Sequence, residues 1–572
     1  MMLKSSSSEL AQSLWSFRKE FVWVGFFSMV ANILMLSPTL YMMQMYDRVL
    51  SSKSELTLLA LSGIAIIFFA VMAFAEWIRS RLLVRAGVRL DVQLNSRLFN
   101  ANFEAYLSNA KLNPAQAFSD LTYIRQFLTG TGVLAFFDAP WTPIYIAVSF
   151  LLHPILGWLA IVFCLIQLGL AFLNHYVTAP ATALTTKASN DSNTYLFSKM
   201  RNAEPAEAMG MVTHLRKRWL AYHQDYLQKN TKSHDKQARL QSLNKLVRYT
   251  MQSLSLGAAA MLVIEGQISV GSMIAANVLV ARALQPLDLL VNTWKQFIQA
   301  RDSYKRLDTL LESYPELMVE RVNLAPKGHL HLQNLVASAA GREMPILNAL
   351  NVNFVAGDII AIIGPSGSGK STLARCLIGI WPNINGQVLL DDTDINTWDR
   401  QLLGPYIGYL PQDIELFDGT IAENIARFSV VDSKKVIEAA QNTGIHESIL
   451  RLPKGYDTQI GESGSVLSGG QRQRLGLARA IYGNPSLIVL DEPNANLDEA
   501  GEKSLLHTIK LLKLQGKTIF IITHRLNLLQ SADQLLVLKE GSIAYFGPRD
   551  EVTNAMRANT NNVSATTVSQ VD

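Results

Sequence analysis

The chain contains 572 residues, of which 49% are hydrophobic and only 17% are charged. Soluble domains carry roughly 25% charged residues, so this composition argues against a wholly soluble protein and excludes a disordered or fibrous chain. The net charge of +5 is too small to indicate nucleic-acid binding. Two cysteines exclude a disulfide framework, and we expect Cys164 and Cys376 to be small buried residues.

Residues 21–311 contain six apolar stretches, which predict a transmembrane domain of three helical hairpins behind a short cytoplasmic N-terminus, residues 1–20. A membrane-spanning helix needs about 20 apolar residues. The stretches lie at about residues 21–43, 56–77, 131–152, 154–173, 246–264 and 268–290, and the last two are the weakest. The chain is therefore expected to cross the lipid bilayer six times.

Basic residues gather after the second, fourth and sixth stretches and set the expected orientation; Arg79, Arg216 and Arg306 are examples. Because the cytoplasmic segments of membrane proteins are enriched in Lys and Arg, both termini and both long connections, 79–128 and 175–245, are predicted to be cytoplasmic. We expect the tips of these connections, near 106–117 and 203–211, to contact a partner.

Two aspartates fall within or beside the predicted spans. A charged group in a membrane is costly and usually faces a bundle interior or a watery cavity. Asp138 fits either a cavity-lining contact or a position at the membrane edge between Phe137 and Pro140, and the sequence favours neither. Asp288 lies at the cytoplasmic end of the last stretch, where we expect it to be solvated.

Beyond a linker at residues 312–328, the segment 329–556 predicts a nucleotide-binding domain. A buried-strand pattern leads directly into the phosphate-loop pattern G-x-x-x-x-G-K-[ST], which a helix follows. The loop consists of Gly364, Pro365, Ser366, Gly367, Ser368, Gly369, Lys370, Ser371 and Thr372. Backbone N–H groups of such a loop surround phosphates, so we expect it to bind ATP, with Lys370 at the β- and γ-phosphates and the Ser371 hydroxyl on Mg²⁺.

Farther along, the apolar segment 487–490 ends in the two carboxylates Asp491 and Glu492. Asp491 suits Mg²⁺ binding through water, and Glu492 suits a general base that positions the attacking water. Alone, such a pair would as readily cap the next helix. Together with the phosphate loop, the pair predicts an ATPase.

Between these motifs stands Leu467-Ser468-Gly469-Gly470-Gln471, and with this signature the chain resembles the ATP-binding cassette (ABC) exporters. The resemblance implies a six-helix transmembrane exporter domain (all-α) followed by an α/β P-loop ABC nucleotide-binding domain. It also implies that Ser468, Gly469, Gly470 and Gln471 complete the ATP site of a second subunit. By the same resemblance, Gln412 contacts Mg²⁺ and senses the membrane domain, and His524 contacts the γ-phosphate.

One nucleotide-binding domain and six spans are half of the usual exporter set, so the resemblance implies a homodimer, and a heterodimer with a paralogue stays open. The segments 36–48 and 136–144, together with Asn494-x-Asn496, resemble type I secretion transporters of the PrtD-like branch. That branch implies export of unfolded polypeptides with a C-terminal signal across the bacterial inner membrane. Its partners are a periplasmic adaptor (membrane fusion protein) and a TolC-like outer-membrane channel.

Several features limit or qualify this resemblance. The stretch 335–341 lacks the aromatic residue on which such exporters stack adenine, so base binding should be looser than usual. About 20 residues precede the first span, so we expect no peptidase domain and no leader cleavage. Residues 557–572 are polar and predict a disordered tail. Two alternatives remain: a lipid or drug exporter of the same architecture, and a regulatory ATPase that transports nothing.

Overall fold

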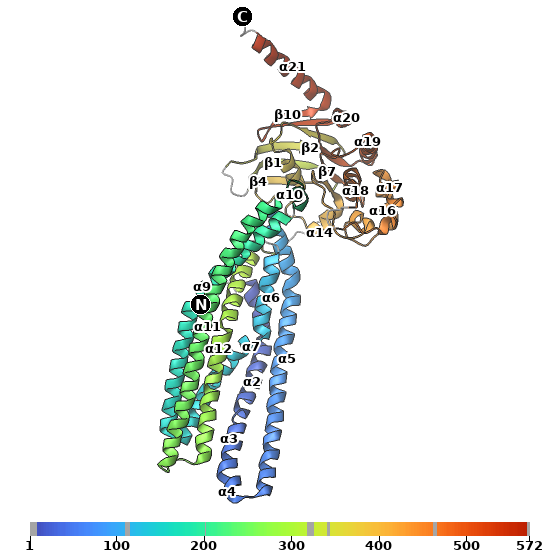
Figure 1. Cartoon of the computed structure of the whole chain (residues 1–572). Helices are drawn as coiled ribbons and strands as arrows, with labels where there is room; N and C mark the ends of the chain where they lie inside the picture. The colour runs from blue at the N-terminus through green and yellow to red at the C-terminus, as the bar shows by residue number, and fades with distance from the viewer. Residues whose placement is uncertain are drawn as a thin grey trace, which may run out of the picture. The chain divides into compact units, whose positions relative to one another are not determined.

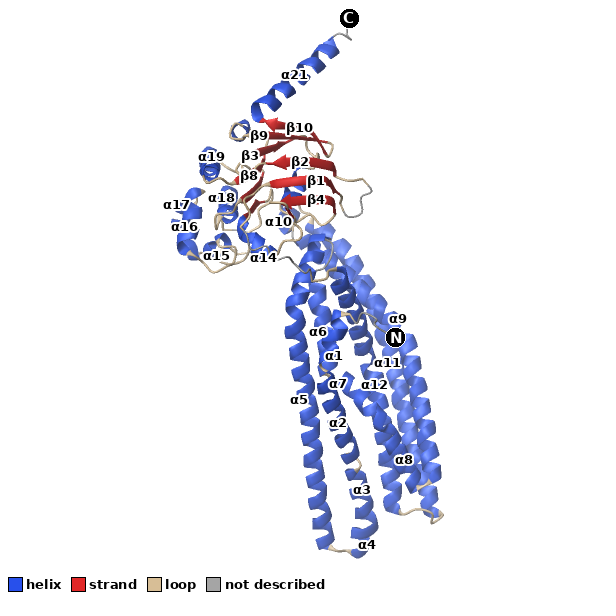
Figure 2. Ribbon diagram, turned by 180° about the vertical axis from the view of Figure 1, so that it is seen from behind, coloured by secondary structure: helices blue, strands red, loops and turns tan. Residues whose placement is uncertain are grey.

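The computed structural model describes residues 8–108, 115–200, 202–316, 325–339, 344–461 and 466–568. The chain divides into two compact units near residue 316. We call the first the helical unit and the second the sheet unit, because the described strands all belong to the second (Figure 2). The expected tip at 106–117, the linker at 312–328 and the stretch 335–341 lie partly outside the described residues.

The helical unit consists of long helices joined by short turns. Its elements are α1 (Glu9–Ser16), α2 (Arg18–Leu34), α3 (Ser37–Gln44), the π-helix η1 (Met45–Val49), α4 (Leu50–Ser52), α5 (Glu55–Ser108), α6 (Ala115–Thr129), α7 (Thr131–Asp138), the 3₁₀-helix η2 (Ala139–Trp141), α8 (Thr142–Leu152), α9 (Pro154–Met200), α10 (Ala203–Ala208), α11 (Val212–Ile264) and α12 (Val270–Ser313). His153 adopts an extended conformation and separates α8 from α9.

Within the described residues, five helical segments are long and apolar enough to cross a membrane: Arg18–Ser52, Glu55–Ser108, Thr131–Leu152, Pro154–Met200 and Val270–Ser313. The fifth expected stretch, 246–264, is the end of α11, which does not qualify. The reason is that Arg248 and Gln252 lower the mean hydropathy of this helix end. It nevertheless packs beside α9 and α12 (Figure 1).

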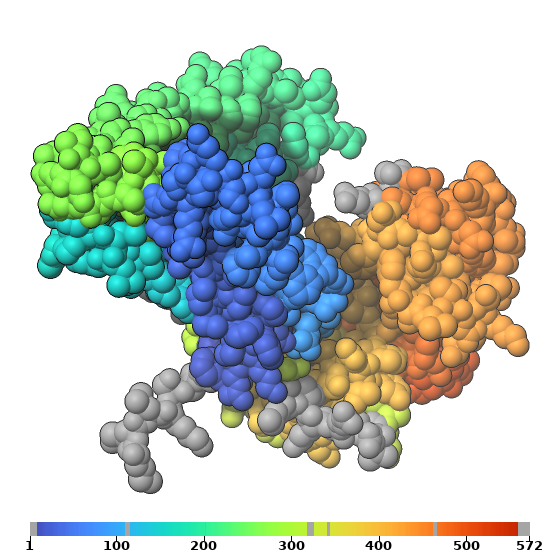
Figure 3. Space-filling view, turned by 90° about the horizontal axis from the view of Figure 1, so that it is seen from below, coloured from blue at the N-terminus to red at the C-terminus, as the bar shows by residue number. Residues whose placement is uncertain are grey.

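At the end of the unit shown in Figure 3, a polar contact joins the first hairpin to α12. The Asp47 carboxylate accepts hydrogen bonds from the Ser269 hydroxyl (2.6 Å) and the Gly271 N–H (2.9 Å). A Cβ on Gly271 would lie 2.6 Å from this carboxylate, so the approach requires glycine. A carboxylate at a helix N-terminus is favourable because free N–H groups and the helix dipole meet it there.

The sheet unit contains two sheets that pack against each other (Figure 2). The strands are β1 (Leu330–Ala337), β2 (Leu347–Phe354), β3 (Ile359–Ile363), β4 (Ile384–Leu390), β5 (Thr393–Asp394), β6 (Ile407–Leu410), β7 (Leu487–Asp491), β8 (Thr518–Ile522), β9 (Gln534–Lys539) and β10 (Ser542–Pro548). The smaller sheet is antiparallel, in the order β2-β1-β4-β5. The larger runs β10-β9-β3-β8-β7-β6 and is parallel except for β10.

The central strands of the larger sheet are apolar on both faces, as expected for buried parallel strands. In β3, Ile360 and Ile362 face a core shared with the smaller sheet, whereas Ile359 and Ala361 face a core shared with helices. Phe354 and Phe520 meet edge to face across the two sheets at 4.8 Å between ring centroids. The strand ends are therefore held in fixed positions.

Helices complete the sheet unit. They are α13 (Lys370–Leu377), α14 (Arg400–Leu403), η3 (Gly404–Tyr406), α15 (Ile421–Ile425), α16 (Ser433–Asn442), α17 (His446–Leu450), η4 (Gly455–Asp457), α18 (Gly469–Ile481), α19 (Glu499–Leu514), α20 (Leu526–Leu529) and α21 (Arg549–Val568). The helical backbone of α21 extends to Val568, whereas the sequence predicts disorder from residue 557. The acidic first turn, Asp550 and Glu551, favours a helix start. Cys164 and Cys376 are both buried and free, as predicted.

Candidate functional site

Four parallel strands end at one edge of the larger sheet and bring the predicted motifs together. Because β3, β8, β7 and β6 are neighbours and run in the same direction, the residues that follow them lie at the same edge. Ligands of open α/β sheets bind outside the carboxyl ends of the strands. The phosphate loop, His524, the Asp491–Glu492 pair and Gln412 all follow one of these four strands.

The phosphate loop joins β3 to α13. Gly369 has φ +99°, and a Cβ there would lie 2.7 Å from Leu347, so the last turn before the helix requires glycine. Lys370 is buried, and its ammonium group donates to the carbonyl oxygens of Gly364 and Pro365, both at 2.9 Å. The residues at the loop tip, including Gly367, are exposed. The loop therefore presents its backbone and the N-terminus of α13 to solvent, as an anion site requires.

Two of the predicted metal-binding residues are in contact. They are Asp491, which offers a carboxylate, and Ser371, which offers a hydroxyl. Burial raises the pKa of Asp491, and a side-chain hydrogen bond with Ser371 partly opposes this rise. Asp491 is 3% exposed, and its Oδ1 is buried without a hydrogen-bond partner among the described residues. A buried carboxylate oxygen with no partner is costly unless a ligand completes it.

This pair fits a hard cation such as Mg²⁺. Mg²⁺ is commonly held by one or two protein oxygens together with substrate phosphates and waters, rather than by an all-protein cage. In agreement, the described part of the chain contains no group of three or more His, Cys, Asp or Glu side chains that could hold a metal alone. Ser371 and Asp491 offer the oxygens that such a shared site needs.

Glu492 stands just beyond β7 in a strained backbone conformation. Its φ is +49°, in the left-handed region that is unfavourable for non-glycine residues. The Glu492 N–H donates to the Ile522 carbonyl (3.0 Å), which anchors this turn to β8. Gln412 Nε2 lies 3.4 Å from Glu492 Oε2, a long hydrogen bond. The structure thus brings together two predicted catalytic residues from strands β6 and β7.

The third predicted catalytic residue, His524, follows β8 at the same edge and is exposed. The residue before it is fixed: Thr523 is fully buried, and its hydroxyl donates to the Asn494 side chain (3.1 Å). The same hydroxyl accepts the Arg525 N–H at 3.1 Å. The turn that carries His524 is therefore tied to the segment that follows Glu492.

The signature residues form the N-terminus of α18. Ser468 and Gln471 cap this helix reciprocally: the Gln471 N–H donates to the Ser468 hydroxyl (3.3 Å), and the Gln471 side chain accepts the Ser468 N–H (2.9 Å). A Cβ on Gly470 would lie 2.9 Å from the Asn496 carbonyl oxygen. Among the described residues, no hydrogen bond joins this turn to the phosphate loop.

Sequence reasoning missed two residues that organise the site. Gln473 is 2% exposed, and its amide donates to the carbonyls of Pro493 (3.1 Å) and Glu492 (3.4 Å). It links the signature helix to the turn of the expected base. A polar residue one turn inside a helix gives only a weak signal, because most such residues are solvated.

The second missed residue is Arg427, which follows α15. Its guanidinium donates to four carbonyl oxygens, those of Gly404 (2.8 Å), Ile407 (3.0 Å), Arg479 (2.9 Å) and Ala480 (2.9 Å). Burial lowers the pKa of Arg427 to about 10. It joins the end of the signature helix to the start of β6, the strand that carries Gln412. A lone arginine in a loop gives no sequence signal for this role.

In the helical unit, Asp138 is buried rather than placed at an exposed edge. Its carboxylate accepts hydrogen bonds from Arg79 (2.7 Å) and Asn32 (2.8 Å). The Tyr145 hydroxyl donates to the Asn32 carbonyl at 2.9 Å, which extends the network to α8. These residues line a cavity of about 100 Å³, which Arg282 also borders. Of the two readings of Asp138, the cavity-lining contact agrees with the structure.

The expectation that Asp288 is solvated is wrong. Asp288 is 7% exposed, and it accepts hydrogen bonds from Gln167 of α9 and from Arg248 of α11 (3.2 Å). Both partners are distant in sequence and meet Asp288 only because the three helices pack together. The sequence by itself therefore could not reveal this burial.

The sequence is similar to that of known transport proteins. It matches the ABC transporter family over residues 347–495 and the ABC transporter transmembrane region over residues 21–287. The type I secretion system ATP-binding protein PrsD of Rhizobium meliloti is 39% identical, over 96% of this chain and 95% of its own length. The chain therefore belongs to the ABC transporters, in the type I secretion branch. It is a multi-pass membrane protein with an ATP-binding domain.

Two further relatives extend this comparison. The leukotoxin translocation ATP-binding protein LktB of Mannheimia haemolytica is 30% identical, over 94% of this chain and 76% of its own length. A solved structure of a bacterial Atm1-family ABC exporter with ATP bound superimposes with a TM-score of 0.81 at 22% identity, covering 94% of this chain and 96% of that chain. At this identity, the Atm1-family structure supports the fold only.

Proposed function

We propose that the chain is an ATP-driven exporter of unfolded polypeptides that carry a C-terminal secretion signal. The observation that carries this proposal is the relationship to PrsD, a type I secretion protein, over nearly the full length of both chains. Because the similarity includes the helical unit as well as the ATPase motifs, it bears on the transported substrate and not only on ATP. LktB, named for leukotoxin translocation, supports the same class of cargo.

In the ATP site, each predicted residue has a distinct task. Residues 364–372 bind the phosphates, and Lys370 turns from the loop carbonyls toward the β- and γ-phosphates when ATP arrives. Ser371, Asp491 and Gln412 hold Mg²⁺, which neutralises phosphate charge when it is bound. Glu492 accepts a proton from the attacking water, and His524 donates to the γ-phosphate. The turn contacts of Glu492 and Thr523 hold these groups at one edge.

The working unit is a homodimer of half-transporters. The signature turn caps its own helix and packs on Asn496, and it makes no hydrogen bond to its own phosphate loop among the described residues. A second copy would supply the missing signature to each ATP site, so that two sites form between two chains. Gln473 links the signature helix to the turn of Glu492, and Asn494 links that turn to Thr523 beside His524, so the two would transmit closure of the dimer to the catalytic residues.

The dimer resides in the bacterial inner membrane, with both termini and the long helical connections in the cytoplasm. There it engages a periplasmic adaptor and a TolC-like outer-membrane channel. The basic residues at the cytoplasmic ends of the spans support this orientation.

The test is the ATPase rate of the full-length protein in lipid nanodiscs, titrated with the C-terminal segment of a secreted protein encoded beside it. We expect a saturable rise in rate with this polypeptide. In Glu492→Gln the rate should fall by about 10²–10⁴-fold, the usual contribution of a general base. ATP binding and dimer assembly should be unchanged.

Lipids and amphiphilic drugs are titrated in parallel. A response to these ligands alone would overturn polypeptide export and favour a small-molecule exporter. A polypeptide that binds and stimulates ATP hydrolysis but is not moved into sealed vesicles would favour a regulatory ATPase. Glu499→Gln, which changes an exposed acid at the start of α19, is the matched control and should leave the rate unchanged.

A further inference from the structure

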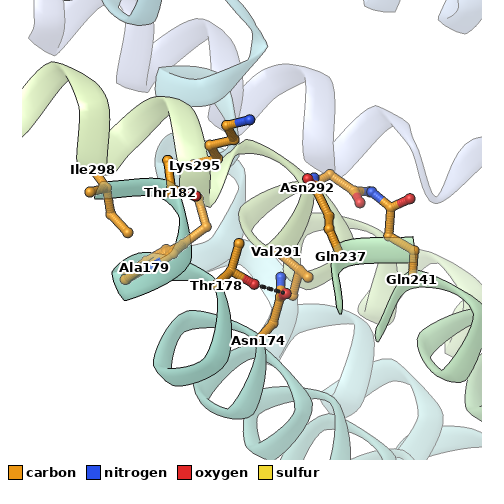
Figure 4. Close-up of a pocket in the computed structure, with 11 residues that line it drawn as sticks. Asn174, Thr178, Ala179, Thr182, Gln237, Gln241, Val291, Asn292, Lys295 and Ile298 are labelled. Carbon is orange, nitrogen blue, oxygen red and sulfur yellow. Dashed lines mark hydrogen bonds between the residues drawn. The ribbon is translucent and has the colours of Figure 1, made fainter. Parts of the chain in front are cut away.

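Three helices of the helical unit change from apolar to polar at the same level. The apolar stretch of α9 ends near residue 173, that of α12 ends near residue 290, and that of α11 begins near residue 246. Immediately beyond these limits, α9, α11 and α12 enclose a pocket lined by residues of all three helices (Figure 4). With the orientation proposed above, this pocket lies just on the cytoplasmic side of the membrane-spanning region.

The lining of this pocket combines amide and hydroxyl side chains with the apolar surfaces of Val291, Trp294 and Ile298. Gln237 and Gln241 come from α11, Asn292 and Lys295 from α12, and Thr182 from α9. Figure 4 shows these side chains gathered around the pocket, and its one dashed line joins the Thr178 hydroxyl to Asn174 at 3.0 Å. The lining contains no acidic residue, so Lys295 gives it one positive charge.

These groups have unused hydrogen-bonding capacity. Among the interactions of the described residues, none provides a side-chain partner for Gln237, Gln241, Asn292 or Lys295. The Thr182 hydroxyl is buried without a partner. Buried polar groups are normally paired, so this hydroxyl marks a place that a ligand can satisfy. Gln241, Asn292 and Lys295 are exposed and Gln237 is half-buried, so these side chains are free to bond the same ligand.

We propose that this pocket binds the backbone of an extended polypeptide. A carboxamide donates and accepts hydrogen bonds, as does each backbone peptide group, so amide side chains can pair with any sequence. Lys295 adds donors for carbonyl oxygens. The enclosed space is only about 30 Å³, enough for a carbonyl group or a single water and not for a lipid chain.

The pocket is therefore a sequence-independent contact for cargo at the cytoplasmic end of the membrane-spanning helices. This inference rests on the proposed function, because it assumes that the exported molecule is a polypeptide. It adds a specific site to that function. Recognition of the C-terminal signal would be a separate event, since these amide groups bond the peptide backbone and do not discriminate between side chains.

The test uses the full-length protein in nanodiscs and a fluorescein-labelled, unstructured peptide of Gly, Ser and Asn residues. A second peptide has the same sequence with alternate backbone nitrogens methylated, which removes N–H donors. Wild-type protein should bind the methylated peptide about three- to tenfold more weakly, the effect of losing one or two hydrogen bonds. In the double variant Gln241→Leu/Asn292→Leu, the parent peptide should weaken by a similar factor and the difference between the two peptides should disappear.

Gln228→Leu is the matched control, because it makes the same change at an exposed position of α11 outside the pocket. It should bind both peptides as the wild type does. The basal ATPase rate verifies that each variant is folded, and the single variants Gln241→Leu and Asn292→Leu replace the double variant if that rate is lost.

The inference is overturned if the wild type binds neither peptide, if methylation has no effect, or if the control weakens binding as much as the pocket variant. A parallel export assay separates this from the proposed function. If wild type exports the secreted protein while the pocket variants keep full peptide affinity, only the pocket inference fails. If wild type moves no polypeptide, the proposed function itself fails.

Discussion

The two units of this protein use buried aspartates in opposite ways. Among the described residues, four aspartates are buried: Asp120, Asp138 and Asp288 in the helical unit, and Asp491 in the sheet unit. Each of the first three accepts a hydrogen bond from an arginine, namely Arg306, Arg79 and Arg248. Asp491 instead leaves one buried oxygen without a partner among the described residues.

This difference distinguishes aspartates that hold helices in place from an aspartate that is available to a ligand. In the helical unit each carboxylate–guanidinium pair joins two different helices, such as α6 and α12 through Asp120 and Arg306. A paired charge is satisfied by the protein alone and so fixes a helix position. In the sheet unit the free oxygen of Asp491 keeps capacity for a ligand. A buried carboxylate with a partner indicates packing, and one without a partner indicates a site.

The largest expected effect comes from breaking a pair in the helical unit. Arg79→Met leaves Asp138 buried without its cation and should destabilise the protein by about 3–5 kcal/mol. Adding Asp138→Asn should recover a large part of this loss, with a coupling of about 1–3 kcal/mol. Thermal unfolding in nanodiscs measures both changes. Arg81→Met, at an exposed position two residues along α5, is the control and should change stability by less than about 1 kcal/mol.

Asp491→Asn should lower the ATPase rate without lowering the stability of the protein. The ATPase rate should fall by about a hundredfold, as for groups that support a metal ion through water. Stability at neutral pH should not fall, because burial raises the pKa of Asp491 and its ionised form therefore disfavours the fold. The wild type should gain stability as the pH falls through this raised pKa, and the variant should lack that gain. A loss of stability in Asp491→Asn at pH 7 would contradict the comparison.

Gln473 combines both roles, because its buried amide has partners and also adjoins the turn that carries Glu492. Loss of this amide in Gln473→Leu leaves the Pro493 and Glu492 carbonyls without this donor and should cost about 1–3 kcal/mol of stability. The turn that carries Glu492 should loosen as well, so the ATPase rate should fall by several-fold while ATP affinity is retained. Rate and unfolding temperature are measured on the same preparation. A change in stability with an unaltered rate would make Gln473 a packing residue only.

The smallest effect is expected where a charge pair is exposed. Glu499 and Lys503 form an i,i+4 pair at 2.7 Å on α19, with side chains 84% and 74% exposed. Such pairs contribute about 0.3–0.5 kcal/mol. Glu499→Gln should therefore shift the unfolding temperature of the protein only slightly, and high salt should abolish the shift. A large shift would show that an exposed ion pair stabilises the sheet unit as much as a buried one stabilises the helical unit.

Local patterns predicted the sheet unit well. The strand before Gly364 and the strand that ends at Asp491 are short apolar runs whose neighbours carry the chemistry, and the parallel order of β3, β8, β7 and β6 places those neighbours together. The phosphate loop was predictable from its own pattern, and Lys370 bonds carbonyls of that loop, but the close approach of Leu347 to Gly369 is a tertiary contact that no motif marks. Gln473 and Arg427 were not predicted, since their partners are backbone carbonyls that no motif marks.

In the helical unit, hydropathy located most of the long helices but not their internal contacts. The apolar stretch at the end of α11 was predicted to span the membrane, but Arg248 and Gln252 make it too polar to qualify. Hydropathy also gave no sign that Arg248 pairs with Asp288. The polar composition of residues 557–572 likewise concealed a helical backbone up to Val568. Composition reports the average environment of a segment, and it does not report which single neighbour a side chain meets.

Spacing along the chain was enough to predict the class of the protein, the order of its two units and a set of candidate residues for the ATP site. Only the tertiary structure decided which charged residues are partnered. Asp138 and Asp491 both follow apolar residues, and nothing in their local sequence tells whether an arginine pairs with either of them. Arg79 reaches one of them because α5 and α7 pack together, whereas packing leaves an oxygen of the other without a partner in the described structure.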